Sequence, residues 1–502
     1  MWYYMNYNLV KSGLLIIIAL AWLARLHNLG DKSLWFDEIV IVALARIPWY
    51  EGLVAALSQG FQLTPLFQWV IKLWLAVGDS EWLLRVPAVA TSVLTVPLLF
   101  KLGRRFFDEG VAWLAAFIFA INPYQVWYGQ ELKLYALLTF ASTGAMLAFS
   151  RMLRTGGRKG SGSLLFFNLL GFPTHYFMFL ISAVQFLYLI ITLKQTYRLL
   201  RPWLAAQGVA VLPLIPWWLF IIQQRIVTVG IGWVPWPEWL TPWRTLWDLN
   251  FGYSGELSPL TVLGLTVMAV GLGLGVWRAW SQSKRGWLLI LWLFFPPLIT
   301  GLMSLGRISF YVDRYLLIIT PALTIVIVAG LLSLRAQLLR WGTVLIFTMA
   351  TAFGLRDVYS EFVKDDWRAI ARQVDRQAQA GDLVITCADG YHLAFEYYNP
   401  HRTLKAKDVI YASQVAEVTK RSLYKVAWVV ALHPRMPAHN LARDTRPVLD
   451  PTTLSPEAAA WATARLQSQV TAPGISAYRY GLSNALALEE VVAWHCRDDK
   501  FF

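Results

Sequence analysis

Long apolar runs between Leu14 and Gly354 constrain the fold of this chain more than any other feature. A helix that crosses a bilayer needs about 20 mostly apolar residues. The run at 163–173 is short and reaches Gly171 and Pro173, which is typical of a tilted or broken helix. The sequence therefore predicts an α-helical polytopic membrane protein with about eleven transmembrane helices, at 9–26, 82–102, 110–124, 134–151, 163–173, 175–194, 203–221, 259–280, 286–304, 313–333 and 339–355.

Basic side chains in the predicted loops indicate the topology. If the N-terminus is cytoplasmic, every predicted cytoplasmic loop contains Lys or Arg, as the positive-inside rule requires. An odd number of spans then places the chain from Asp357 outside the cytoplasm, in a multi-pass protein of the plasma (inner) membrane. The formal net charge of +14 follows from these loops. Because no basic patch is interleaved with base-stacking aromatic residues, nucleic acid is excluded as a partner.

Outside this membrane, the sequence predicts two long loops and one folded domain. The first loop covers 27–81 and contains a short apolar segment, 65–77, that is expected to lie along the interface. The second loop covers 222–258 and is rich in Trp and Pro. The membrane domain covers 1–356. The remaining residues, 357–502, are typical of a soluble α/β domain large enough to bury its own core.

The elements expected in the C-terminal domain follow from its apolar patterning. An amphipathic helix is predicted at 367–382, and a helix with a Ser455 cap is predicted at 455–470. Strands are predicted at 383–387, 424–433 and 487–496. The acids of KDDWRAIARQV (364–374) favour an ordinary helix start. Cys387 and Cys496 form one disulfide in an oxidising compartment or remain two free thiols, and both states stay open.

The motif SLWFDE (33–38) carries the strongest chemical signal. Asp37 and Glu38 follow an aromatic pair just outside the first predicted span. Charges close to hydrocarbon are costly and are usually functional. A carboxylate is also the group that takes a proton from an attacking hydroxyl. The competing interpretation is a helix cap or a solvated acidic turn.

Several segments resemble one family in their order along the chain. RLHNLGDKSLWFDE (25–38) resembles the opening of membrane glycosyltransferases with the GT-C fold, in the family 39-like branch of protein O-mannosyltransferases and lipid A aminoarabinose transferases. The resemblance covers about residues 20–355. The further similar segments are LTPLFQWVIKLW (63–74), SEWLLRVPAV (80–89), KLGRRFF (101–107), NPYQVWYGQELKLYAL (122–137), THYF (174–177) and VDRYLLIITPAL (312–323).

The resemblance implies an inverting transfer of a hexosyl or pentosyl group from a polyprenyl-phosphate donor, outside the cytoplasm. The acceptor would be a lipid, a glycan or a protein. Asp37 matches the catalytic base, and Glu38 matches its partner; the two are also candidate ligands for Mg²⁺ or Mn²⁺. Glu131 matches a glutamate of the second outside loop that faces the same cavity.

A lipid-phosphate leaving group also needs cations and hydrogen-bond donors. Lys133 and Arg314 lie at the outside ends of predicted spans, and Arg85 is a third candidate for binding the phosphate. Tyr128, Tyr135, His175 and Tyr315 are candidates for binding the sugar or lipid, with packing or interfacial anchoring as the alternative.

The sequence departs from the family pattern at three places. Thr64 precedes Pro65 where relatives often have His or Lys before two prolines, and Lys133 stands where relatives often have Arg. The segment FQLT (61–64) has no acid where aminoarabinose transferases have one, which disfavours that branch and a metal site built from two carboxylates. Two other functions suit a multi-span chain with long outside loops: a flippase for lipid-linked glycans, and an O-antigen polymerase or ligase. The chain shows no internal repeat of the kind common in transporters, and its strongest motif lies in the first loop rather than late in the chain.

Overall fold

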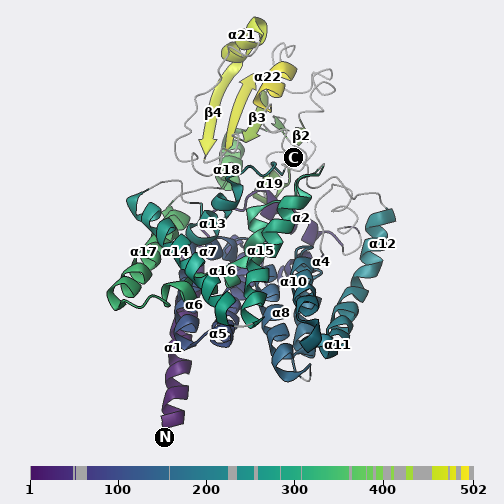
Figure 1. The fold of residues 1–502 in the computed structure, drawn as a ribbon. Helices are drawn as coiled ribbons and strands as arrows, with labels where there is room; N and C mark the ends of the chain where they lie inside the picture. The colour runs from purple at the N-terminus through teal and green to yellow at the C-terminus, as the bar shows by residue number, and fades with distance from the viewer. Residues whose placement is uncertain are drawn as a thin grey trace. The chain divides into compact units, whose positions relative to one another are not determined.

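The chain divides into two compact units that do not follow each other in sequence. The computed structural model describes residues 2–48, 51, 65–157, 159–223, 234–253, 258–282, 284–306, 308–360, 364–379, 382–387, 392–398, 409–411, 426–432, 455–472, 475–481 and 488–496. Unit 1 comprises Met1–Leu29 and Pro48–Ser360, and unit 2 comprises Gly30–Ile47 and Glu361–Phe502 (Figure 1). Residues 30–47, which were expected to belong to the membrane domain, therefore group with the C-terminal domain.

All regular secondary structure in the described part of unit 1 is helical. Its helices are α1 (Trp2–Leu26), α4 (Pro65–Trp74), α5 (Glu81–Phe106), α6 (Glu109–Ile121), α7 (Pro123–Gly129), α8 (Tyr135–Thr155), α9 (Ser161–Gly171), α10 (Met178–Ile191), α11 (Leu193–Val211), η1 (Leu212–Leu214), α12 (Ile215–Gln223), α13 (Thr241–Phe251), α14 (Pro259–Gln282), α15 (Lys284–Met303), η2 (Asp313–Ile319), α16 (Thr320–Leu331) and α17 (Gln337–Ser360).

These helices confirm a multi-pass membrane protein. Among the described residues, seven helical segments are long and apolar enough to cross a membrane, and the number is eight if α6 and α7, which meet at an angle of 55°, count as one span. Three shorter apolar helices, Ser12–Leu26, Ser161–Gly171 and Met178–Ile191, occupy the remaining predicted runs. Helix α4 has ten residues and is too short to cross, in keeping with the expected interfacial segment.

Helix α16 forms the centre of unit 1. All of its residues from Thr320 to Leu331 are buried, as expected for a helix that is apolar on every side. Its backbone approaches α14 closely, because a Cβ added at Gly330 would lie 1.9 Å from the carbonyl oxygen of Gly271. Small residues permit such close packing between helices inside a membrane.

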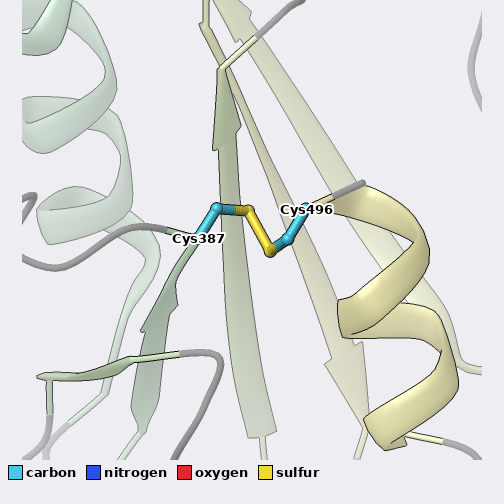
Figure 2. Close-up of a disulfide and its surroundings, with 2 residues drawn as sticks. All are labelled: Cys387 and Cys496. Atoms are coloured by element: carbon cyan, nitrogen blue, oxygen red, sulfur yellow. A yellow bond between two sulfur atoms is a disulfide. The ribbon is translucent and has the colours of Figure 1, made fainter. Parts of the chain in front are cut away.

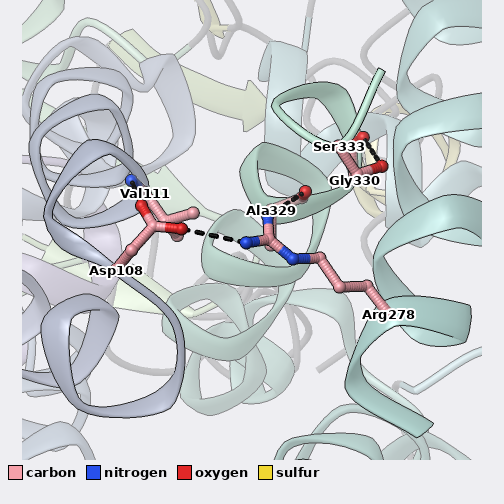
Figure 3. A network of polar contacts seen from close by, with 6 residues as sticks. All are labelled: Asp108, Val111, Arg278, Ala329, Gly330 and Ser333. Carbon is pink, nitrogen blue, oxygen red and sulfur yellow. Dashed lines mark hydrogen bonds and ion pairs between the residues drawn. The ribbon is translucent and has the colours of Figure 1, made fainter. Parts of the chain in front are cut away.

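A polar network joins three helix ends on one side of unit 1. Arg278 at the end of α14 donates to the Asp108 carboxylate at 2.9 Å and to the carbonyl oxygen of Ala329 at 2.9 Å (Figure 3). The other Asp108 oxygen accepts from the backbone N–H of Val111 and so caps α6. One arginine thereby satisfies a carbonyl at the end of α16 and anchors the start of α6.

Unit 2 contains a five-stranded mixed sheet. Its strand order is β2-β1-β3-β5-β4, with β1 parallel to β2 and β3, and β5 antiparallel to β3 and β4. The strands are β1 (Leu383–Thr386), β2 (Val409–Tyr411), β3 (Val426–Leu432), β4 (Leu466–Ala472) and β5 (Ile475–Gly481). Its helices are α2 (Phe36–Arg46), α18 (Trp367–Gln377), α19 (His392–Tyr398), α21 (Pro456–Arg465) and α22 (Leu488–His495).

Two predicted elements of this domain were wrong. The segment 487–496 is the helix α22 and not a strand, because Leu488, Val491 and Val492 are buried at helical spacing. The helix that begins after the Ser455 cap ends at Arg465, and the following residues form β4. The Ser455 cap itself is confirmed, since its side chain accepts from the N–H of Ala458.

Cys387 and Cys496 form a disulfide, which resolves the two states that the sequence left open (Figure 2). Their Cα atoms are 5.0 Å apart, and 109 positions separate them in sequence. The bond joins the end of β1 to the end of α22. It therefore links the first strand of the sheet to the last described helix of unit 2.

Candidate functional site

The break between α6 and α7 positions one side of the site. Pro123 cannot continue α6, and the Asn122 side chain caps α7 by accepting from the N–H of Gln125 at 2.9 Å. The side-chain amide of Asn122 also donates to the carbonyl oxygen of Leu249 at the end of α13. The break therefore places α7, with Tyr124 and Tyr128, beside the end of α13.

Arg25 stabilises the same break from the side of α1. It is fully buried and donates to the carbonyl oxygens of Ala120 and Phe119 at the end of α6, and to the Ser92 hydroxyl. Carbonyls at a helix C-terminus carry partial negative charge and lack helical partners. This first residue of the motif-bearing stretch 25–38 is thus part of the scaffold.

Tyr253 is a site residue that the sequence did not reveal. Gly252 ends α13 with a positive φ of +73°, and Tyr253 follows directly. Its hydroxyl bonds the hydroxyls of Tyr124 at 3.3 Å and Tyr128 at 2.5 Å, and donates to Asp313 at 3.2 Å. The only sequence signal for this residue is a Gly-Tyr pair after an amphipathic helix. Such a pair is not part of any motif that would mark Tyr253 as a site residue.

Arg314 lies in a group of aromatic rings that includes most of the predicted sugar- and lipid-binding residues. Its guanidinium carbon is 5.9 Å from the ring centroids of both Tyr135 and Tyr315. The ring of Tyr315 lies 4.6 Å from His175, and that of Tyr135 lies 5.1 Å from Tyr128. We call these five residues, with Tyr253, the arginine–tyrosine cluster.

His175 is neutral in this cluster. Burial and the neighbouring Arg314 lower the pKa of His175 to about 3. Its Nδ1 accepts from the N–H of Phe177, so the proton is on Nε2. In the described part of the chain this buried Nε2 has no hydrogen-bond partner, which is unusual for a buried donor and points to a ligand.

Glu131 and Lys133 lie on the turn between α7 and α8. Glu131 is buried, and it is close enough to Tyr128 and Tyr135 to interact electrostatically with both. The preceding Gln130 fixes the turn by donating to the carbonyl oxygens of Arg25 and His27. Lys133 is half-buried two residues beyond Glu131.

Arg85 is buried in α5 and donates to the carbonyl oxygen of Leu29 at 2.8 Å. This contact ties α5 to the chain that leaves α1. A carbonyl partner at this distance favours a structural role over the phosphate-binding role expected from sequence.

Asp248 is a second residue that the sequence did not reveal. It is 8% exposed, and its Oδ1 has no hydrogen-bond partner among the described residues. Burial and the neighbouring Asp313 raise the pKa of Asp248 well above its ordinary range, while Arg244 acts in the opposite direction. A buried carboxylate close to a second one favours the protonated form.

Asp37 and Glu38 begin α2 in unit 2. Glu38 is fully buried, accepts from the N–H of Trp35 at 3.2 Å, and pairs with Lys364 at 3.8 Å. Asp37 is only partly buried. Both acids lie in the first turn, where the helix dipole stabilises negative charge. The cap interpretation therefore holds for Glu38.

The acidic pair does not have the form of a metal site. Glu38 already serves a backbone N–H and a lysine, and a lysine beside a carboxylate opposes binding of a second cation. Within the ranges that the structure describes, no group of three or more His, Cys, Asp or Glu residues could hold a metal ion. These residues do not fit the Mg²⁺ or Mn²⁺ site expected from sequence. The departure at Thr64 lies outside the described residues.

Comparison with a protein family and with known sequences gives one match. The family profile of dolichyl-phosphate-mannose-protein mannosyltransferases matches residues 62–220. No curated protein sequence matches the chain significantly.

Comparison with solved structures shows the fold. The chain is similar to ArnT from Cupriavidus metallidurans in the apo state, with 13% identity and a TM-score of 0.56 over 96% of this chain and 99% of that one. The structure of ArnT bound to undecaprenyl phosphate gives 14% identity and 0.57 over 94% and 99%.

A second neighbour is the archaeal oligosaccharyltransferase AglB from Archaeoglobus fulgidus, solved with an inhibitory peptide and a dolichol-phosphate. It gives 11% identity and a TM-score of 0.52 over 86% of this chain and 70% of that one. The GT-C fold predicted from the sequence is therefore confirmed.

Proposed function

We propose that this chain is an inverting glycosyltransferase that moves a sugar from a polyprenyl-phosphate donor to an acceptor on the extracytoplasmic side of the membrane. The observation that carries this proposal is the arginine–tyrosine cluster, in a fold shared with a protein that has been solved with undecaprenyl phosphate. Lipid, glycan and protein all remain candidate acceptors.

The cluster supplies what a lipid phosphate requires. Arg314 offers a planar set of N–H donors that suits phosphate oxygens. Its position beside the rings of Tyr135 and Tyr315 limits the side-chain freedom that binding would otherwise remove. His175 adds a neutral N–H donor without adding charge. Lys133 adds a second cation by its place on the nearby turn.

The proposed reaction is a single displacement. The acceptor hydroxyl oxygen attacks the anomeric carbon, and the bond from that carbon to the phosphate oxygen breaks. Asp37 takes the hydroxyl proton, and the bond electrons leave with the polyprenyl phosphate, which Arg314 stabilises. One attack on the opposite face inverts the anomeric configuration.

The C-terminal domain is inferred to face outside the cytoplasm, with the N-terminus inside. Disulfides form and persist in oxidising compartments, and unit 2 contains the Cys387–Cys496 bond. The same compartment holds the sugar-bearing ends of the donors in this reaction. The plasma (inner) membrane remains the proposed location.

A transfer assay in proteoliposomes tests this function. A panel of radiolabelled polyprenyl-phosphate sugars is offered with a membrane extract as the acceptor, and two products are measured: sugar bound covalently to the acceptor, and donor moved unchanged between leaflets. We expect sugar from one of these donors to become covalently bound to the acceptor. Movement of intact donor without transfer would instead support the flippase.

A further inference from the structure

The helix that carries Asp37 is held by residues from the start of the C-terminal tail. Lys364 is 9% exposed by its side chain, and its Nζ lies 3.8 Å from Oε2 of the fully buried Glu38. The same ammonium group lies 5.6 Å from the ring centroid of Trp35. Lys364 thus contacts the residues on both sides of the turn that begins α2.

Further contacts bracket this turn within unit 2. The Ser33 hydroxyl donates to the carbonyl oxygen of Asp365 at 3.0 Å, and Arg368 donates to that of Gly30 at 3.1 Å. The N–H of Leu34 donates to the Tyr398 hydroxyl. The approach to α2 is therefore anchored by α18 and α19, whereas Asp37 itself stays partly exposed.

The Glu38–Lys364 pair is formed at the same first turn of α2 that contains Asp37. Glu38 uses one oxygen for both the N–H of Trp35 and Lys364, so a change at Lys364 acts on the capping bond of α2. A buried carboxylate that loses its cation is strongly disfavoured and moves or takes a proton. Either response would shift the first turn, which contains Asp37.

We infer that Lys364 is a positioning residue, which holds the first turn of α2 through Glu38 so that Asp37 points at the reacting hydroxyl. This inference rests on the proposed role of Asp37 as the base. The two predicted motifs, SLWFDE and KDDWRAIARQV, are thereby one functional arrangement, although 331 positions separate Ser33 from Lys364 (364 − 33).

The test uses the full chain in lipid with Lys364→Met, Lys364→Arg, Glu38→Gln and the double variant Lys364→Met/Glu38→Gln. Arg376→Met, exposed on α18, is the matched control. Three quantities are measured: kcat, the donor Kd, and the hydrogen-exchange rate of the α2 amides. Lys364→Met should lower kcat by between about tenfold and a hundredfold, because a misplaced base costs rate rather than binding.

In the same variant the donor Kd should stay unchanged and α2 should exchange faster. Lys364→Arg should restore most of kcat, and the double variant should lose much less than the product of the two single losses. An unchanged kcat, or a loss confined to the donor Kd, would overturn the inference. The role of Asp37 as the base is tested separately, because activity retained in Asp37→Asn would exclude that role. An unchanged exchange rate of the α2 amides in Lys364→Met would instead show that Lys364 does not hold the first turn of α2.

Discussion

Arg314 and Lys133 carry the charge proposed to meet the donor phosphate, and Arg314 lies beside the rings of Tyr135 and Tyr315. Both were predicted from their place at the outside ends of spans. The contacts between Arg314 and the rings could not be predicted from sequence. They join η2, α8 and the segment between α9 and α10, and no local sequence pattern encodes contacts between such distant segments.

Replacing Arg314 should weaken donor binding. Arg314→Met removes the guanidinium, and charge-assisted hydrogen bonds contribute about 1.5–3 kcal/mol, so the Kd for undecaprenyl phosphate should rise roughly ten- to a hundredfold. Arg314→Lys should recover part of this. Binding is measured on purified protein, with Arg244→Met as the control, because Arg244 is exposed in the same unit. Equal Kd values for Arg314→Met and the wild type would place the phosphate elsewhere.

Asp248 should make the folded chain less stable at neutral pH. Its pKa is raised in the folded state, so its contribution is most favourable below the ordinary carboxyl pKa of about 3.9 and is lost as the pH rises. In Asp248→Asn, the amide has nearly the same shape as the protonated carboxyl group and carries no charge. This substitution should raise the Tm at pH 7, and the gain should vanish towards pH 4.

The exposed Asp31 provides the control for this comparison, since Asp31→Asn should leave the Tm unchanged at both pH values. A lower Tm for Asp248→Asn at pH 7 would show that the carboxylate is ionised and paired. Asp248 was missed because an acid in a tryptophan-rich outside loop is ordinary in sequence, and only the fold reveals its burial beside Asp313.

At the scale of elements, the apolar runs predicted the helices of unit 1 well, because a bilayer requires a minimum length of apolar helix. Short elements in unit 2 were harder. The segment 487–496 contains two consecutive valines, Val491 and Val492, and β-branched residues favour a strand. The burial of Leu488, three positions before Val491, shows instead that the buried residues share one face of a helix. Tertiary packing overrode local propensity there.

The α6–α7 break should matter for function beyond its share of stability. Asn122→Ala removes the cap of α7 and the bond to the carbonyl oxygen of Leu249, and loss of an N-cap costs about 1 kcal/mol. Transfer should fall because α7 carries Tyr128 towards Tyr253. Ser80→Ala removes the cap of α5 and is the control. Equal transfer rates in the two variants would show that the α6–α7 break does not position the site residues for transfer.

At the scale of the whole molecule, the proposed topology can be tested by accessibility. The two cysteines of the chain form the disulfide, so a single introduced thiol reports alone. Gln373→Cys, exposed on α18, should react with an impermeant maleimide in intact cells, whereas Gln337→Cys, exposed at the start of α17, should react only after permeabilisation. The reverse pattern would invert the proposed orientation.

The grouping of residues 30–47 with the C-terminal tail was also beyond sequence reasoning. The SLWFDE motif was assigned to a loop of the membrane domain by its position after the first span. Its partners Lys364, Asp365 and Tyr398 lie more than 300 positions away, and a buried ion pair at that separation leaves no local trace.

In the proposed reaction, Asp37 takes the acceptor proton while the arginine–tyrosine cluster holds the donor. The most direct measurement compares sugar transfer and donor binding on the same preparations of wild type and Asp37→Asn, with Asp31→Asn as the matched acid in the same segment. We predict that Asp37→Asn binds the donor like the wild type and transfers no sugar. Sugar transfer by Asp37→Asn at the wild-type rate would show that Asp37 is not the base.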